Sequence, residues 1–125
     1  ENLIYCLLTQ KVIMYGALGV PQVKEQQEIF GELFDKINYV ECNQADGWAE
    51  ECKEKGINNI PTWSFPQESG IEDQLLSCEE CQKKSGGIYC NDYCFEKSSD
   101  GKTFYVTGVM DLQTLSKLSG CQSNK

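Results

Sequence analysis

The cysteines limit the possible folds more than any other feature, because the chain has eight of them and no histidine among its 125 residues. The absence of histidine excludes Ser-His and Cys-His nucleophile pairs and histidine-ligated metal sites. An even number of cysteines at this density indicates disulfides, a thiolate metal site, or both. Disulfides predict an exported protein or an oxidising compartment, whereas fully reduced thiols around zinc predict the cytoplasm.

The length and charge of the chain narrow the class further. The length fits a single domain, residues 1–125, and 40% hydrophobic residues predict a folded globule with a modest core. A net charge of -8 disfavours phosphate backbones and anionic membrane surfaces, so we expect no nucleic-acid partner. No run approaches the roughly 18 apolar residues of a membrane span, so we expect no direct membrane insertion.

Hydrophobic periodicity predicts alternating strands and helices. Residues 12–15 predict a buried strand, and the apolar stripe after Pro21 predicts a helix with proline in its first turn. The other predicted elements are a helical turn at 3–8, strands at 37–42, 60–65 and 103–108, a polar helix at 46–55, and a last helix between Asp111 and Gly120. This order predicts an α/β fold with a central mixed sheet flanked by helices.

A cysteine-rich segment, residues 67–102, interrupts this pattern. It is rich in Gly, Ser, Glu and Lys, and it contains Cys78, Cys81, Cys90 and Cys94. Four sulfurs in two close pairs can surround zinc, and the same sulfurs can instead form two disulfides that staple a segment with few apolar residues. Both alternatives stay open. A redox-active Cys78/Cys81 pair is disfavoured, because the two glutamates between them raise the thiol pKa values.

Short segments in order along the chain carry a resemblance to a known family. They are MYGA at 14–17, KEQQEIFG at 24–31, YVEC at 39–42, Cys52, GI at 56–57, PTW at 61–63, GV at 108–109 and LSGC at 118–121. Together they resemble the thioredoxin-like domain that is fused to, or works beside, bacterial vitamin K epoxide reductase homologues. The resemblance implies a thioredoxin-like fold with the cysteine-rich segment inserted in its last hairpin.

The family carries a Cys-x-x-Cys pair at the turn between the first strand and its helix, where this chain has Val20, Pro21, Gln22 and Val23. A helix N-terminus lowers the pKa of the first thiol, and the second thiol resolves the mixed disulfide. Valine is neither a nucleophile nor a metal ligand, so these positions have no catalytic residue. The pattern is that of a binding groove without its reactive atoms, and both valines are also compatible with packing of the helix on the sheet.

The resemblance assigns roles to residues near Pro61. Ile60 and Pro61 match the family's cis-proline segment, which faces the turn at 20–23 and pairs with an extended substrate backbone. We expect Trp63 in the core. Because the strands at 60–65 and 103–108 should form a hairpin, we expect the cysteine-rich segment at the end of the sheet away from Pro61.

Two pairs of cysteines lie outside the cysteine-rich segment. Cys42 and Cys52 match a structural disulfide found in exported members of the family, and it would close a short loop. Cys6 and Cys121 lie near the two ends of the sequence, which are often close together in compact domains. A bridge between them and a pair of free thiols are both compatible with the sequence.

Three functions remain compatible with the sequence. The first is a module of oxidoreductase lineage that binds an extended polypeptide or a thiol-disulfide partner protein without exchanging disulfides at 20–23. The second is a substituted form of an active disulfide oxidoreductase that partners a membrane-embedded, vitamin K epoxide reductase-like enzyme. The third is an interaction domain that acts through the cysteine-rich segment, stabilised by zinc or by disulfides. Enzymatic activity is therefore undecided at this level.

Overall fold

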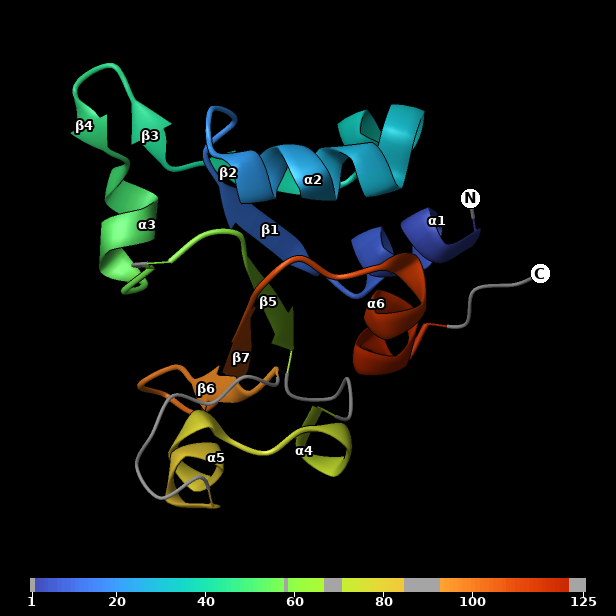
Figure 1. The fold of residues 1–125 in the computed structure, drawn as a ribbon, viewed down its shortest axis with the longest axis vertical. Coiled ribbons are helices and arrows are strands. Elements are labelled where there is room, and N and C mark those ends of the chain that lie inside the picture. Colours follow the sequence, from blue (N-terminus) through green and yellow to red (C-terminus); the bar gives the residue numbers. More distant parts are fainter. Residues whose placement is uncertain (1, 58, 67–70, 85–92, 122–125) are drawn as a thin grey trace.

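The structure, a computed structural model, describes residues 2–57, 59–66, 71–84 and 93–121 (Figure 1). Its helices are α1 (Asn2–Thr9), α2 (Pro21–Phe30), the 3-10 helix η1 (Gly31–Lys36), α3 (Glu50–Glu54), α4 (Ile71–Gln74), α5 (Cys78–Lys84) and α6 (Leu112–Ser119). Its strands are β1 (Ile13–Gly16), β2 (Asn38–Glu41), β3 (Asn43–Gln44), β4 (Gly47–Trp48), β5 (Thr62–Pro66), β6 (Phe95–Lys97) and β7 (Thr103–Thr107). None of the described helices combines the length and apolar character that crossing a membrane requires.

Five strands form one mixed sheet in the order β2-β1-β5-β7-β6. Strands β1 and β2 are parallel, and α2 supplies the crossover between them that a parallel pair needs. The next strands are all antiparallel to their neighbours, β5 to β1, β7 to β5 and β6 to β7. The predicted α/β class, with a central mixed sheet flanked by helices, is confirmed.

The two faces of this sheet differ in how they are covered. Alternate strand residues, among them Met14, Trp63 and Phe104, face α1, α2 and α6 and form the main core. On the opposite face a smaller cluster gathers around Tyr15 and the short helix α3. Because α3 has five residues, it leaves much of this second face to polar side chains of β5 and β7. The prediction that Trp63 belongs to the core is confirmed.

The helix ends agree with the sequence signals. Helix α2 begins at Pro21, directly after Val20 in an extended conformation. Asp111 caps α6 by accepting a hydrogen bond from the Thr114 N–H at 2.7 Å, and Gly120 ends the helix at a φ of 77°. These helix ends could be predicted from the sequence, because capping depends on residues that are close together in the chain.

The prediction of one helix over 46–55 was wrong at its start. Residues 43–48 form the β3–β4 hairpin instead, and helix α3 covers only Glu50–Glu54. Ala45 and Asp46 form the turn, and Gly47, the first residue of β4, has a φ of 117° that favours glycine. The Trp48 indole N–H donates to the Ile57 carbonyl at 3.0 Å, which ties the hairpin to the loop after α3.

The cysteine-rich segment supplies part of the sheet. Between β5 and β7 it contains α4, α5 and β6, and these lie together at the lower end of the molecule in Figure 1. Ile71 and Phe95 are buried in the main core, and Lys97 makes a 2.9 Å ion pair with Glu72. Buried apolar side chains, and not disulfides alone, therefore hold the segment to the rest of the domain. Strand β6 was not predicted, because its three residues contain one apolar side chain.

Candidate functional site

Disulfides join Cys6 to Cys121, Cys42 to Cys52, and Cys78 to Cys94. The first is one of the two alternatives that the sequence left open, and the second is the pairing that the resemblance implied. Cys42 and Cys52 are both 0% exposed in the small cluster beneath α3, and Cys121 is 2% exposed. Three such bonds indicate an oxidising environment.

The described disulfide of the cysteine-rich segment is not the disfavoured Cys78/Cys81 pair. Cys78 bonds to Cys94, so a redox pair between Cys78 and Cys81 is wrong for this structure. Cys81 is also disulfide-bonded, and Cys90 lies outside the described residues. Sulfurs in a disulfide are not thiolates and do not ligate zinc, so at Cys78 and Cys94 the structure adopts the disulfide alternative. In the described ranges, no three acidic, cysteine or histidine side chains are placed to hold a metal ion.

The four residues of the turn before α2 have different environments. Val23 is 0% exposed and packs against Gly16, with its Cγ2 atom 3.1 Å from where a Cβ on that glycine would lie. Val23 is therefore a core residue, and its predicted role in a groove is wrong. Val20 is half-buried against the main core, whereas Pro21 and Gln22 are exposed.

The peptide bond between Ile60 and Pro61 is cis, as the resemblance implied. The Pro61 carbonyl accepts a 2.9 Å hydrogen bond from the Gly108 N–H, which fixes this loop against the end of β7. In the part of the chain that the structure describes, neither the N–H nor the C=O of Ile60 makes a hydrogen bond. A partly exposed main-chain pair of this kind can bond to another chain.

A cavity of about 650 Å³, the Pro61 pocket, opens beside this loop. It is lined by Gln22, Asn59, Ile60, Pro61, Cys78, Gln82, Tyr93, Cys94, Glu96, Tyr105, Thr107, Gly108 and Val109. The structure thus brings Gln22, Ile60 and Pro61 together, while Val20, Pro21 and Val23 are not part of the lining. The expectation that the cysteine-rich segment lies away from Pro61 is wrong, since Cys78 and Cys94, which its described disulfide joins, line the same pocket.

Tyr93 explains why the segment lies beside Pro61. Its hydroxyl donates to the Val109 carbonyl, and its ring packs on Gly108. A Cβ on Gly108 would lie 3.0 Å from the ring, and the φ of 130° at this residue also favours glycine. Burial is the main cause of the raised pKa of Tyr93, with smaller contributions from Asp111 and Glu25. The hydroxyl therefore stays protonated and able to donate near neutral pH.

Gln26 supports, from within the core, the wall of the Pro61 pocket that Gly108 and Val109 form. Its Oε1 atom accepts from the Met110 N–H at 2.8 Å and from the Trp63 indole N–H at 3.3 Å, and its Nε2 atom donates to the Met110 carbonyl at 2.7 Å. This fully buried side chain links α2 to the loop that carries Gly108 and Val109. Sequence reasoning missed it, although a glutamine between Val23 and Phe30 on the buried stripe of a helix was a usable signal.

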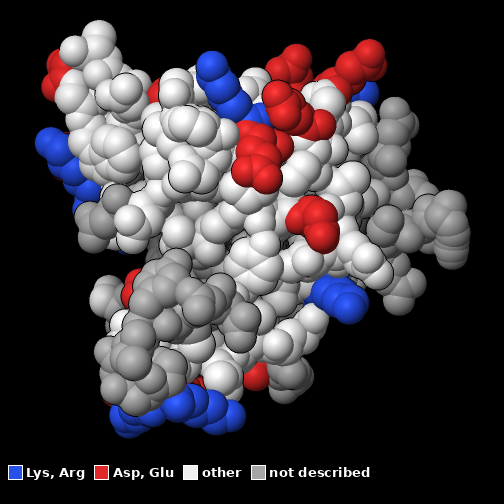
Figure 2. Space-filling view, in the orientation of Figure 1, with Lys and Arg blue, Asp and Glu red and all other residues white. Residues whose placement is uncertain are grey.

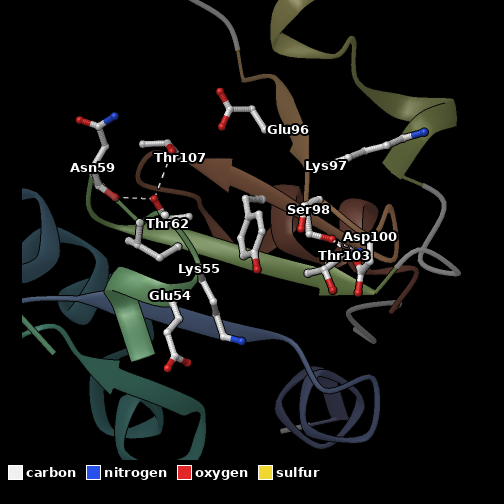
Figure 3. A pocket seen from close by; sticks show the side chains of 14 residues that line it. Glu54, Lys55, Asn59, Thr62, Glu96, Lys97, Ser98, Asp100, Thr103 and Thr107 are labelled. Carbon is white, nitrogen blue, oxygen red and sulfur yellow. Dashed lines mark hydrogen bonds between the residues drawn. The ribbon is translucent and has the colours of Figure 1, made fainter. Parts of the chain in front are cut away.

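A second hollow of about 540 Å³, the strand-face pocket, continues the first across the uncovered face of the sheet. The two share Asn59, Glu96, Tyr105 and Thr107. Figure 3 shows Glu54 and Lys55 on one side of it and Lys97 on the other, with the Thr62 and Thr107 hydroxyls facing each other beside Asn59. These hydroxyls lie 3.1 Å apart. Together the pockets form one groove that follows β7 and is lined largely by polar groups.

The Pro61 pocket carries negative charge. Glu96 is the one charged side chain among its described lining residues, and the charges of Asp111 and Glu25 act on Tyr93, which also lines it. Acidic side chains also gather over α2 at the top of the face in Figure 2. This charge favours a cationic partner over an anionic one.

No model of a known protein family matches the sequence.

Proposed function

We propose that this chain is a thioredoxin-like domain that binds an extended polypeptide in the groove formed by the Pro61 pocket and the strand-face pocket. The order of its strands supports the thioredoxin-like assignment. A parallel β1-α2-β2 unit followed by the antiparallel strands β5 and β7 and by α6 agrees with what the resemblance implies. The domain is of oxidoreductase lineage and faces an oxidising, exported environment, in keeping with its disulfides.

The observation that carries this proposal is the position of Ile60. Its main-chain N–H and C=O have no hydrogen-bond partner among the described residues, and its side chain lines the same pocket as Gln22 and Pro61. An extended peptide that pairs with Ile60 would continue along the polar side chains of β7. Main-chain hydrogen bonds would then give affinity, and the pocket would select side chains.

The turn at 20–23 contributes Gln22 to the lining of this groove and no reactive group. Val20 is half-buried and Val23 is fully buried, and neither has a sulfur atom. The partner is an unfolded polypeptide or the extended segment of a thiol-disulfide protein, including one that belongs to a membrane-embedded reductase.

Binding of a labelled peptide tests the proposal. The probe is an unstructured ten-residue peptide that is rich in lysine and has serine in place of cysteine. Fluorescence anisotropy follows its binding to the full chain. Glu96 lines both pockets, so Glu96→Lys should weaken binding about ten-fold through loss of charge complementarity. Glu32→Lys is the matched control, an exposed acid on η1 outside both pockets, and should bind like the parent chain. Equal effects of the two variants, or no binding at all, would contradict the proposal.

A second candidate, an active oxidoreductase with substituted cysteines, is favoured by the geometry of the turn. Val20 lies at the N-terminus of the ten-residue helix α2 with Val23 behind it, where a nucleophilic and a resolving thiol are placed in the family. The double change Val20→Cys with Val23→Cys should then give insulin-reducing activity that the parent chain lacks. An inactive double variant that still folds would remove this candidate.

A further inference from the structure

We infer that the Cys78–Cys94 disulfide is a thiol-accepting site, and that it reacts with a cysteine of a polypeptide held in the Pro61 pocket. The inference rests on the proposed peptide binding and names the partner's chemistry. The family's reactive positions carry valine in this chain, and the disulfide that lines the groove belongs to the cysteine-rich segment.

The placement of this bridge sets it apart from the other two bridges whose cysteines both lie in the described part of the chain. Cys78 and Cys94 are both half-buried, and both line an open cavity. Cys42 and Cys52 have no exposed surface, and the Cys6–Cys121 bridge has one sulfur-bearing residue in the main core. Thiol-disulfide exchange requires an attacking thiolate to reach a sulfur atom, so access decides which bridge reacts.

The bridge is also held in place against the pocket. Cys94 lies between Tyr93, whose hydroxyl donates to the Val109 carbonyl, and Phe95, which is buried in the main core. On the other side of the bridge, the Phe95 N–H donates to the Leu76 carbonyl at 3.1 Å, close to where α5 begins with Cys78. A peptide paired with Ile60 would therefore meet both sulfurs in fixed positions.

The reaction balances without a further reagent. The peptide thiolate attacks one sulfur of the bridge, the Cys78–Cys94 bond breaks, and a mixed disulfide forms. The released cysteine leaves as a thiolate and takes up the proton that the peptide thiol lost. A second thiol of the same peptide then attacks the mixed disulfide, so the peptide gains a disulfide and loses two electrons, which the protein keeps as two thiols.

The charge of the pocket selects among peptides. The carboxylate of Glu96 in the lining favours lysine or arginine next to the reacting cysteine, and the charges of Asp111 and Glu25, which act on Tyr93, have the same sign. Such a cation also lowers the pKa of the peptide thiol and raises its thiolate fraction. A peptide with glutamate in the same position should be repelled and should hold less thiolate.

The test uses the oxidised full chain and three peptides that share one backbone. One has cysteine between lysines, one has cysteine between glutamates, and one has serine between lysines. Mixtures are quenched with acid, and mass spectrometry after digestion maps each mixed disulfide. We expect adducts at Cys78 or Cys94 that form about ten-fold faster with the lysine-flanked peptide than with the glutamate-flanked one. In the Glu96→Lys variant, the lysine-flanked peptide should react about ten-fold more slowly than with the parent chain. Glu32→Lys, the matched control, should leave both rates unchanged.

Several results would overturn the inference. Adducts mainly at Cys81, Cys42 or Cys6 would assign the reaction to another bridge, and equal rates for the lysine-flanked peptide and glutathione would remove the role of the pocket. Binding of the serine peptide without any adduct of the cysteine peptide would refute this inference while leaving the proposed function intact. Failure of the serine peptide to bind would refute the proposed function and, with it, this inference. Because the adducts are mapped on the parent chain, no cysteine variant has to fold.

Discussion

Two bridges of this molecule look alike in the sequence and differ in the structure. Cys42 and Cys52 are 10 positions apart and Cys78 and Cys94 are 16 apart, and both bonds close short loops. The first lies in a buried cluster, and the second lines an open pocket beside Pro61. The difference teaches that spacing identifies a bridge, whereas burial and neighbours decide whether it is structural or open to exchange.

The surroundings of Cys42–Cys52 show what keeps a bridge inert. Its cluster includes Tyr15 and Ile57, and the Cys42 N–H donates to the Gly16 carbonyl at 2.8 Å. Burial is the main cause that raises the pKa of Tyr15 to about 12, followed by the charge of Glu51. A phenol that loses this much solvation indicates a dry environment, and a reductant would reach these sulfurs only when the cluster opens.

The largest expected effect is on stability. Replacing the buried bridge by Cys42→Ala with Cys52→Ala should lower the free energy of unfolding by about 3 kcal/mol, because the unfolded chain regains the entropy of a short loop. Urea titration followed by tryptophan fluorescence measures it. Adduct formation at Cys78 or Cys94 should persist in the folded variant. A loss of that reaction at unchanged stability would reverse the roles that we assign to the two bridges.

The order of reduction gives the next effect. With a limiting small thiol under native conditions, we expect Cys78–Cys94 to be reduced more than about a hundred-fold faster than Cys42–Cys52, since opening a buried cluster costs about 3 kcal/mol or more. Timed alkylation and peptide mapping give both rates from one sample. Comparable rates would remove the distinction between the bridges.

Gln26 offers a way to disturb one bridge and spare the other. Gln26→Leu leaves the Met110 N–H and carbonyl without partners in the core, so we expect a loss of about 2 kcal/mol in unfolding free energy. The pocket wall at Val109 should loosen, and the reduction rate of Cys78–Cys94 should rise while that of Cys42–Cys52 changes less. Gln27→Leu, at a half-buried neighbouring position, is the control and should change the stability by less than about 0.5 kcal/mol.

The smallest effect is confined to alkaline solution. The pKa of Tyr15 is higher in the folded chain than the value of about 10 in an unfolded one, so between pH 10 and about 12 the unfolded state binds fewer protons. The contribution of Tyr15 to stability should therefore be unaffected near neutral pH and should fall above pH 10, by at most about 1.4 kcal/mol per pH unit for this one group. Tyr15→Phe should show a shallower decline in a pH series of urea titrations. An identical slope would mean that the cluster around Cys42 is wetter than described.

Local signals made much of the fold predictable. The strand before Pro21, the helix that starts there, and the last helix between Asp111 and Gly120 all depend on residues within a few positions of each other. The resemblance located Ile60 and Pro61 and the pair Cys42–Cys52, which the structure contains. The resemblance gave no information on the contacts within the cysteine-rich segment, because none of its matched segments lies in residues 67–102.

The site was less predictable because contacts between distant residues form it. Tyr93 holds the cysteine-rich segment against Gly108 and Val109, and nothing in the local sequence indicates that contact. Strand β6 exists through its pairing with β7, not through a pattern of its own. Val23 was assigned to the groove by analogy with a catalytic position, yet an apolar side chain there packs into the core.

The Cys6–Cys121 bond joins residues 115 positions apart and closes nearly the whole chain into a covalent ring. The two Cα atoms lie 5.8 Å apart, so the ring closes across a short gap. One cut by a protease between these cysteines would open the ring without releasing a fragment. The nicked molecule would weigh one water more than the intact one, and its two pieces would separate only after reduction. A single cleavage would thus create a new N-terminus and a new C-terminus, while the disulfide kept the two pieces joined.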